Sequence, residues 1–135
     1  MRLSKKAEYA LRAMTAMARG GEGANFSIQE IAQAEGIPLK FLEQILLALK
    51  NGGLLRSKRG VGGGYQLLVP PTRISLGSII HLIDGPFDPL GDEGSGALGA
   101  LMGELKTRVD DWLGSTTLGN VIEKERELTS LSFEI

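Results

Sequence analysis

The chain has 135 residues, of which 42% are hydrophobic and 23% are charged, with a net charge of −1, no cysteine and one histidine. This composition predicts one folded domain with a substantial core, and it excludes disulfides, thiolate nucleophiles, cysteine-held zinc or iron–sulfur sites, and any metal site that needs two histidines. No run approaches the ~18 apolar residues of a membrane span and the N-terminal residues lack the apolar stretch of a signal peptide, so we expect a cytoplasmic protein without membrane attachment or cofactor.

The near-zero net charge hides two unequal halves. Residues 1–66 carry ten basic and five acidic side chains, a net of +5, whereas residues 67–135 carry five basic and eleven acidic ones, a net of −6. This asymmetry favours a basic half that contacts a polyanion such as nucleic acid and an acidic half with another role.

Three helices are predicted in the N-terminal part. Ser4 can cap a helix over 4–18, in which apolar residues recur every three or four positions. Ser27 and Glu30 form a capping-box pattern at the start of a second helix that ends at Gly36. Pro38 suits the first turn of a third helix, which ends before residues 52–53. Its predicted apolar stripe comprises Leu39, Leu42, Ile45, Leu46 and Leu49. The short turn at Gly36 makes the second and third helices a helix-turn-helix.

The period then changes to that of short strands. Strands are predicted at 54–58 and 65–69 around a glycine-rich turn at 59–64, which indicates a β-hairpin. Ser75 can cap a fourth helix, with Leu76, Ile79, Ile80 and Ile83 inside. A loop rich in Gly, Pro and Asp covers 84–96, and two further helices are predicted at 97–113 and 116–127.

This order of elements predicts a mainly α fold with a small β-hairpin wing. We expect a winged helix-turn-helix domain at residues 1–84, a flexible loop at 85–96, and a segment at 97–135 that contains a long dimerisation helix.

The third helix carries a set of side chains suited to DNA. Lys40, Phe41, Glu43 and Gln44 project from its first two turns on the side opposite the apolar stripe. The N-terminal part of the second helix of a helix-turn-helix enters the major groove, where Glu can accept from cytosine and Gln can pair with adenine. Lys40 suits a phosphate, and Phe41 a thymine methyl or a sugar. The alternative is a solvated helix face with one exposed aromatic ring.

The hairpin turn is both basic and rich in glycine. Arg56, Lys58 and Arg59 precede the turn, and Arg59 could enter a narrow, strongly negative minor groove. Close approach of the backbone to phosphate is allowed by Gly60, Gly62 and Gly63. A phosphate-binding P-loop is excluded because no Gly-Lys-Ser/Thr follows, and a dinucleotide fingerprint fails at Tyr65. A plain exposed hairpin remains the alternative.

Other polar residues carry weaker signals. His81 lies between predicted core positions Ile80 and Leu82 and has no evident acid–base partner, so we expect a surface residue rather than a catalyst. The loop acids could hold a hard cation, but they lack the spacing of an EF-hand, and a solvated loop is expected. These acids are Asp84, Asp88, Asp92 and Glu93.

The predicted helix at 97–113 has a continuous apolar stripe at spacings of three and four residues. The stripe consists of Leu98, Leu101, Leu105, Val109 and Trp112. It could pack within its own domain, but the first four helices already form a unit. We therefore expect it to pair with a second copy, which would also allow a twofold dimer to read twofold-related half-sites.

Several segments resemble the Rrf2 family of bacterial transcriptional regulators. They are residues 1–14 (MRLSKKAEYALRAM), 31–44, 53–65 (GLLRSKRGVGGGY), 75–80 and 117–121. The resemblance implies a homodimeric winged-helix protein that binds double-stranded DNA, with the third helix in the major groove and the wing in the minor groove. It implies DNA contact at Glu43, Gln44 and Arg59, and adds Tyr9 and Phe41.

The chain departs from that family in one respect. Well-known members hold an iron–sulfur cluster with cysteines in the loop before the long helix, and here that loop has none, with Gly96 in the place of the last cysteine. Glu8 lies near the position of a carboxylate ligand in some members, but one carboxylate cannot hold a cluster. The chain therefore resembles a cluster-free member, in which the loop could instead contact a small-molecule or protein effector, or have lost sensing.

Together these patterns predict a sequence-specific transcriptional regulator, a repressor rather than an activator, and not an enzyme. The alternative is an interaction module whose winged helix binds a partner enzyme instead of DNA.

Overall fold

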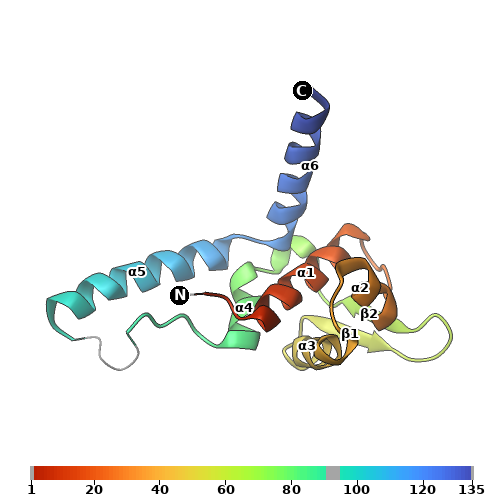
Figure 1. The fold of residues 1–135 in the computed structure, drawn as a ribbon, viewed down its shortest axis with the longest axis horizontal. Helices are drawn as coiled ribbons and strands as arrows, with labels where there is room; N and C mark the ends of the chain where they lie inside the picture. Colours follow the sequence, from red (N-terminus) through yellow and green to blue (C-terminus); the bar gives the residue numbers. More distant parts are fainter. Residues whose placement is uncertain (1, 91–94, 135) are drawn as a thin grey trace.

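The protein is described by a computed structural model that covers residues 2–90 and 95–134. Over these residues a helical body carries a two-stranded hairpin, and two long helices extend from it (Figure 1). The elements in chain order are α1 (Lys5–Arg19), α2 (Ile28–Glu35), α3 (Leu39–Asn51), β1 (Leu55–Lys58), β2 (Gly64–Leu67), the short 3-10 helix η1 (Pro71–Arg73), α4 (Leu76–Asp84), α5 (Gly96–Ser115) and α6 (Leu118–Glu134). The predicted mainly α architecture with a hairpin wing is confirmed.

Local capping signals set the starts of the first helices. The Ser4 hydroxyl accepts from the backbone N–H of Ala7 at 2.9 Å. Ser27 and Glu30 form the full capping box, with bonds of 3.1 and 3.3 Å. Gly36 ends α2 in the left-handed conformation, with φ of 64°, so α3 begins after a very short turn. Pro38 is the residue that precedes α3 rather than a member of its first turn.

The core lies between α1, α3 and the elements packed on them. Leu42, Ile45, Leu46 and Leu49 are fully buried, as the stripe on α3 predicts. Leu39 is not, because its side chain is 42% exposed. It lies in the first turn of α3, at the edge of the stripe. Ser75 caps α4 as predicted, but Leu82 also lies outside the core.

The hairpin is antiparallel, with Leu55 opposite Leu67 and Lys58 opposite Gly64. Its strands are shorter than predicted at their outer ends, since Pro70 and Pro71 turn the chain into η1. A separate bridge joins Phe26, just before α2, to Tyr65, through backbone bonds of 2.9 and 2.7 Å. The segment before α2 thus supports β2 from the side.

The two C-terminal helices extend away from the body in different directions (Figure 1). None of the twenty residues of α5 is buried, although this helix is about 30 Å long. Its C-terminal end approaches α4 closely, where a side chain at Gly77 would press on Leu113. α6 extends beyond its predicted end, and its first residue, Leu118, is fully buried in the core. No helix of the described residues is long and apolar enough to cross a membrane.

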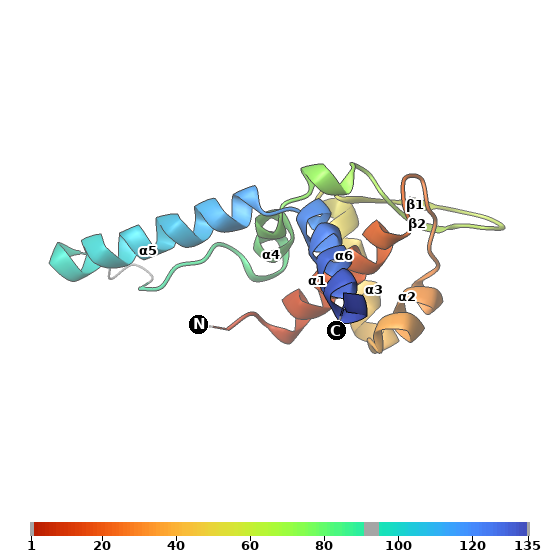
Figure 2. The same cartoon turned by 90° about the horizontal axis from the view of Figure 1, so that it is seen from above.

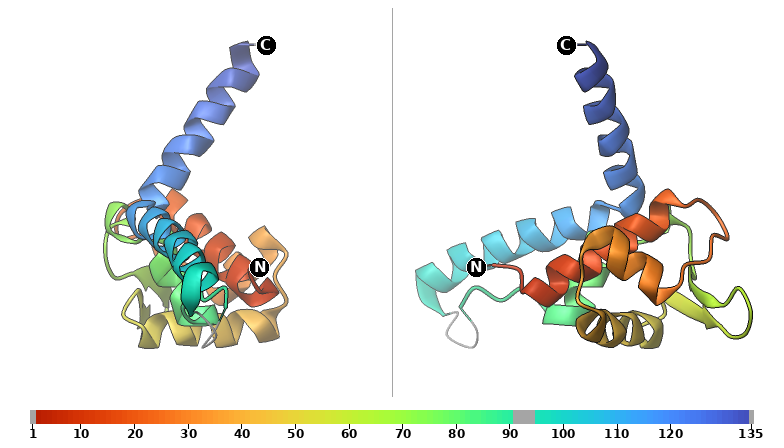
Figure 3. Two further views of the ribbon diagram at one scale, coloured as in Figure 1. Left: turned by 90° about the vertical axis from the view of Figure 1, so that its left-hand side faces the viewer. Right: turned by 45° about the vertical axis from the view of Figure 1, so that its right-hand side comes forward.

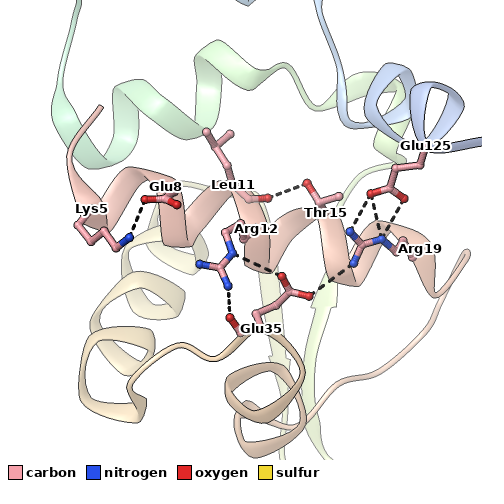
Figure 4. A network of polar contacts seen from close by, with 8 residues as sticks. All are labelled: Lys5, Glu8, Leu11, Arg12, Thr15, Arg19, Glu35 and Glu125. Carbon is pink, nitrogen blue, oxygen red and sulfur yellow. Dashed lines mark hydrogen bonds and ion pairs between the residues drawn. The ribbon is translucent and has the colours of Figure 1, made fainter. Parts of the chain in front are cut away.

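An ion-pair network joins α6 to the first two helices (Figure 4). The Arg19 guanidinium donates three hydrogen bonds of 2.7–3.1 Å to the Glu125 carboxylate on α6. Arg19 also lies 3.5 Å from a carboxylate oxygen of Glu35, the last residue of α2. Arg12 completes the network, with its Nε 3.6 Å from the other Glu35 oxygen and its terminal amino group donating to the Glu35 carbonyl. The middle of α6 is therefore tied to α1 and to the end of α2, the helix that precedes α3.

This network predicts a small, pH-dependent contribution to stability. Hydrogen bonding to Arg19 lowers the pKa of Glu125, and the same pairing raises the pKa of Arg19. A carboxylate with a lowered pKa in the folded state stabilises the fold above its unfolded pKa, and this stabilisation is lost as the pH falls through the folded pKa. Because both side chains are partly exposed, Glu125→Gln should cost no more than about 1 kcal/mol near neutral pH.

Denaturant unfolding measured from pH 7 to pH 3 checks this expectation. The difference between Glu125→Gln and the parent should shrink as the pH falls through the lowered pKa of the Glu125 carboxylate, and disappear once the parent carboxylate is also protonated. The control is Glu127→Gln, which removes an exposed carboxylate on α6 whose one partner among the described residues is Lys124, at 3.3 Å. A difference that stays constant with pH would show that the Arg19 pair is not its source.

Candidate nucleic-acid interface

The predicted recognition residues of α3 lie on its solvent side. Lys40, Phe41, Glu43 and Gln44 are all exposed, opposite the buried stripe of the same helix. Glu43 and Gln44 make no side-chain hydrogen bond or ion pair within the described part of the chain, so their polar groups are available to base edges. α3 lies at the opposite end of the molecule from α6 in both views of Figure 3.

Two aromatic rings and two cations form a cluster beside this face. The Phe41 ring is 49% exposed and lies 6.5 Å from the half-buried ring of Tyr9 on α1, measured between centroids. Lys5 and Arg12 lie 5.3 and 5.7 Å from the Tyr9 ring centre. Phe41 therefore has an aromatic partner within the chain, which the sequence did not indicate. Tyr9 and Phe41 therefore lie close enough together to belong to the same candidate DNA-binding surface.

The basic residues of the hairpin are exposed next to this end of the body. Leu55 at the start of β1 is buried, and side chains alternate between the two faces of a strand. Arg56 and Lys58 therefore both face outward, and both are exposed. Arg59 begins the turn and is also exposed. The hairpin extends well beyond the helices (Figure 2), as an element that reaches into a groove must.

The glycines of the turn have steric reasons to be glycine. Gly60 and Gly62 have φ of 95° and 74°, which side-chain-bearing residues rarely adopt. A Cβ on Gly63 would overlap the carbonyl oxygens of Lys58 and Gly60. A Cβ on Gly64 would overlap the carbonyl oxygen of Phe26, at the bridge that supports β2. These constraints explain the glycines without DNA, and their contact with DNA stays a prediction.

The bridge at Gly64 leads to a stability prediction. Gly64→Ala should lower the free energy of unfolding by about 1–3 kcal/mol, because backbone must move to admit the methyl group. Urea denaturation measures the loss. Gly103→Ala is the control, since it lies in α5 with nothing within 4 Å of the added atom and alanine favours a helix. Unfolding midpoints for Gly64→Ala equal to the parent's would contradict the close contact.

Three residues of this surface were missed by sequence reasoning. Val61 at the hairpin tip is fully exposed, and an isolated valine among turn glycines was the available signal. Asn25 donates to the carbonyl of Gly62, and Gln66 donates to the carbonyl of Gly23 at 3.3 Å. These two contacts join residues about 40 positions apart, and no local pattern marks them.

The apolar stripe of α5 is largely uncovered. Leu101 and Trp112 are 58% and 60% exposed, Leu98 is exposed as well, and Leu105 and Val109 are partly buried. Trp112 also borders an apolar groove of about 530 Å³ between α4, α5 and α6, with Leu76, Val121 and Leu128 in its lining. Several exposed large apolar side chains along one helix favour an interaction surface there.

The remaining polar candidates make structural contacts. His81 is an exposed surface residue, as expected, and its Nε2 atom lies 3.9 Å from Asp110 on α5, which also pairs with Lys106 at 2.6 Å. That partner lies on a helix that the sequence does not place near α4. Asp84 accepts from the Ser4 backbone N–H at 3.0 Å and from its hydroxyl. Asp92 and Glu93 lie outside the described residues. Among the described residues, no group of three or more His, Asp or Glu side chains could hold a metal ion.

Comparison with known proteins decides the family. The family model described as Rrf2, "Iron-dependent Transcriptional regulator", matches residues 3–124. The chain belongs to the Rrf2 family. The regulator IscR of Escherichia coli is 32% identical over 136 residues, which cover 95% of this chain and 84% of IscR. A candidate regulator of the helix-turn-helix type from Mycobacterium tuberculosis is 45% identical over 98 residues, or 73% of this chain, and the chain spans 61% of that relative's length.

Two solved structures have the same fold as this chain. CymR of Bacillus subtilis, described as the global cysteine regulator of that organism, is 33% identical, with a TM-score of 0.81 over 92% of this chain and 98% of CymR. IscR of T. potens is 27% identical, with a TM-score of 0.82 over 95% of this chain and 90% of that one.

The iron in the family description does not fit the residues of this Rrf2 protein. The chain has no cysteine and one histidine. Glu8, near the position of a carboxylate ligand in some members, pairs with Lys5 at 3.1 Å. The chain therefore cannot hold an iron–sulfur cluster through thiolates.

Proposed function

We propose that this protein is a sequence-specific DNA-binding transcriptional regulator that acts as a cytoplasmic homodimer and has no enzymatic activity. In this proposal α3 enters the major groove and the hairpin wing enters the adjacent minor groove. The observation that carries it is the exposed set Lys40, Glu43 and Gln44 on α3, next to an exposed hairpin with three cations. The relatives named as transcriptional regulators support it further and give no support to a protein-binding alternative.

Each part of the surface has a distinct role in this proposal. Glu43 and Gln44 read base edges, while Lys40 contacts phosphate. Phe41, supported by Tyr9, covers a sugar or a thymine methyl. Arg59 and the exposed Val61 at the wing tip occupy the minor groove, where cations and apolar side chains both bind. Arg56 and Lys58 contact the backbone beside it.

The second copy is proposed to cover α5 and the groove at the base of α6. Leu98, Leu101 and Trp112 would otherwise remain in water on a helix without a single buried residue. A twofold dimer places two copies of α3 on half-sites about one helical turn apart, or a multiple of it. We accordingly propose residues 1–84 as the DNA-binding part and residues 97–135 as the dimerising part, with 85–96 as their connection.

Genome-wide footprinting with the purified protein tests the proposal. The expected result is a small set of twofold-symmetric sites near promoters, with half-sites spaced by whole turns of DNA. Repression predicts that neighbouring genes rise in expression when the protein is deleted. Recovery of a stoichiometric enzyme partner, with no retained DNA, would contradict the proposal and favour the interaction module.

A further inference from the structure

The outward face of the hairpin contains one pair of polar side chains that bond to each other. Arg56 on β1 and Gln66 on β2 are directly opposite in the strand register. The Nε–H of Arg56 donates to Oε1 of Gln66 at 3.1 Å. Of the five N–H donors of an arginine, this bond uses one, and the four on the terminal amino groups make no hydrogen bond to any described residue.

The orientation of the Gln66 amide is fixed by a second bond. Its Nε2 donates to the carbonyl oxygen of Gly23, in the segment between α1 and α2, at 3.3 Å. A flipped amide would place a donor against the Arg56 Nε–H and an acceptor against a carbonyl oxygen. Only one orientation satisfies both neighbours, and that orientation presents an acceptor to Arg56.

The segment that anchors Gln66 is itself attached to the hairpin. Phe26 exchanges two backbone hydrogen bonds with Tyr65, and Asn25 donates to the carbonyl of Gly62. Gly64 allows the close approach, since any larger residue would overlap Phe26. Gly23 is therefore part of a support connected to the wing at several points, rather than a free loop.

We propose that Gln66 is a positioning residue for DNA binding, which holds the guanidinium of Arg56 ready to grip a DNA phosphate. An arginine side chain loses much rotamer freedom when it is immobilised at an interface, and ordering it beforehand reduces that loss on binding. The two terminal amino groups left free match a phosphate in bidentate fashion. Arg56 lies within the strand, so it contacts the backbone while Arg59 occupies the groove. The inference rests on the proposed function.

A double-mutant cycle measured by operator binding tests the coupling. The set comprises the parent, Arg56→Ala, Gln66→Ala and the double variant, each titrated with operator duplex at several salt concentrations. Gln66→Ala should weaken binding about three- to tenfold, and the double variant should bind no more weakly than Arg56→Ala alone. Arg56→Ala should reduce the slope of log affinity against log salt by about 1, the loss of one phosphate contact.

Lys58 provides the matched control, because it lies on the same strand and face but has no bond to Gln66. Losses from Gln66→Ala and Lys58→Ala should multiply. Gln66→Met keeps the length of the side chain but removes the acceptor for Arg56, so it should weaken binding as Gln66→Ala does. Urea unfolding midpoints of the Gln66 variants equal to the parent's show that the fold is intact. The positioning role alone would be overturned if the losses of operator affinity in Arg56→Ala and Gln66→Ala multiply in the double variant, or if Arg56→Ala binds with the parent's affinity. Failure of the parent to bind any operator would overturn the proposed function as well.

Discussion

Leu101→Glu is expected to convert the protein from a dimer to a monomer and to weaken operator binding by about 100-fold or more. Leu101 belongs to the apolar stripe in the N-terminal half of α5 and is 58% exposed, so the change leaves the core of a single copy intact. A glutamate in a paired apolar surface would be buried without a partner, and this cost opposes association. The affinity falls because each monomer must then bind its half-site separately. Two linked binding events give an overall affinity about 10²–10⁴-fold higher than one binding event alone.

Sedimentation equilibrium and operator titration on the same samples measure both effects. Thr107→Glu is the matched control, because it adds the same charge to an exposed position of α5 away from the apolar stripe. The control should remain a dimer with the parent's affinity. A Leu101→Glu protein that stays dimeric would place the interface elsewhere on the chain.

Glu43→Ala is expected to remove discrimination at one base pair, worth about 1–3 kcal/mol. Glu43 is exposed on α3 and makes no ion pair within the part of the chain that the structure describes. A carboxylate near DNA is repelled by phosphates, so its presence on the recognition face is favourable only if it accepts from a base. Cytosine offers such a donor in the major groove.

The measurement is competition binding against operators that carry every single base-pair substitution. The parent should reject replacements at one cytosine per half-site, and Glu43→Ala should tolerate them while its affinity for random duplex stays equal or rises. Glu104→Ala removes an exposed carboxylate from α5 and should leave the base preferences unchanged. If Glu43→Ala keeps the parent's preference at every position, Glu43 does not read a base.

Features determined by neighbouring residues could be predicted well from the sequence. Ser4, Ser27 and Ser75 cap helices as expected, because a cap bonds to a backbone N–H only three residues away. The hairpin follows from its glycines in the same local way. Leu39 shows the limit of periodicity: the stripe identifies the buried side of a helix, but not how far its neighbours extend along it.

Contacts between distant segments could not be predicted. Arg19 meets Glu125 across 106 positions, and His81 meets Asp110 only because the end of α5 packs on α4. Gln66 reaches Gly23 because the segment before α2 pairs with β2 at Phe26, and that segment has no strand pattern in the sequence. For the interface, sequence reasoning identified the side chains that face solvent, whereas the residues that hold them in position emerged from the tertiary structure.

Equilibrium binding to operator and to random duplex over a range of salt concentrations tests the central claim most directly. The account predicts that the operator is bound at least about 10³-fold more tightly than random DNA. It also predicts that log affinity falls linearly with log salt as phosphate contacts release counterions. Equal affinity for the two duplexes, or an affinity that does not change with salt, would contradict the account.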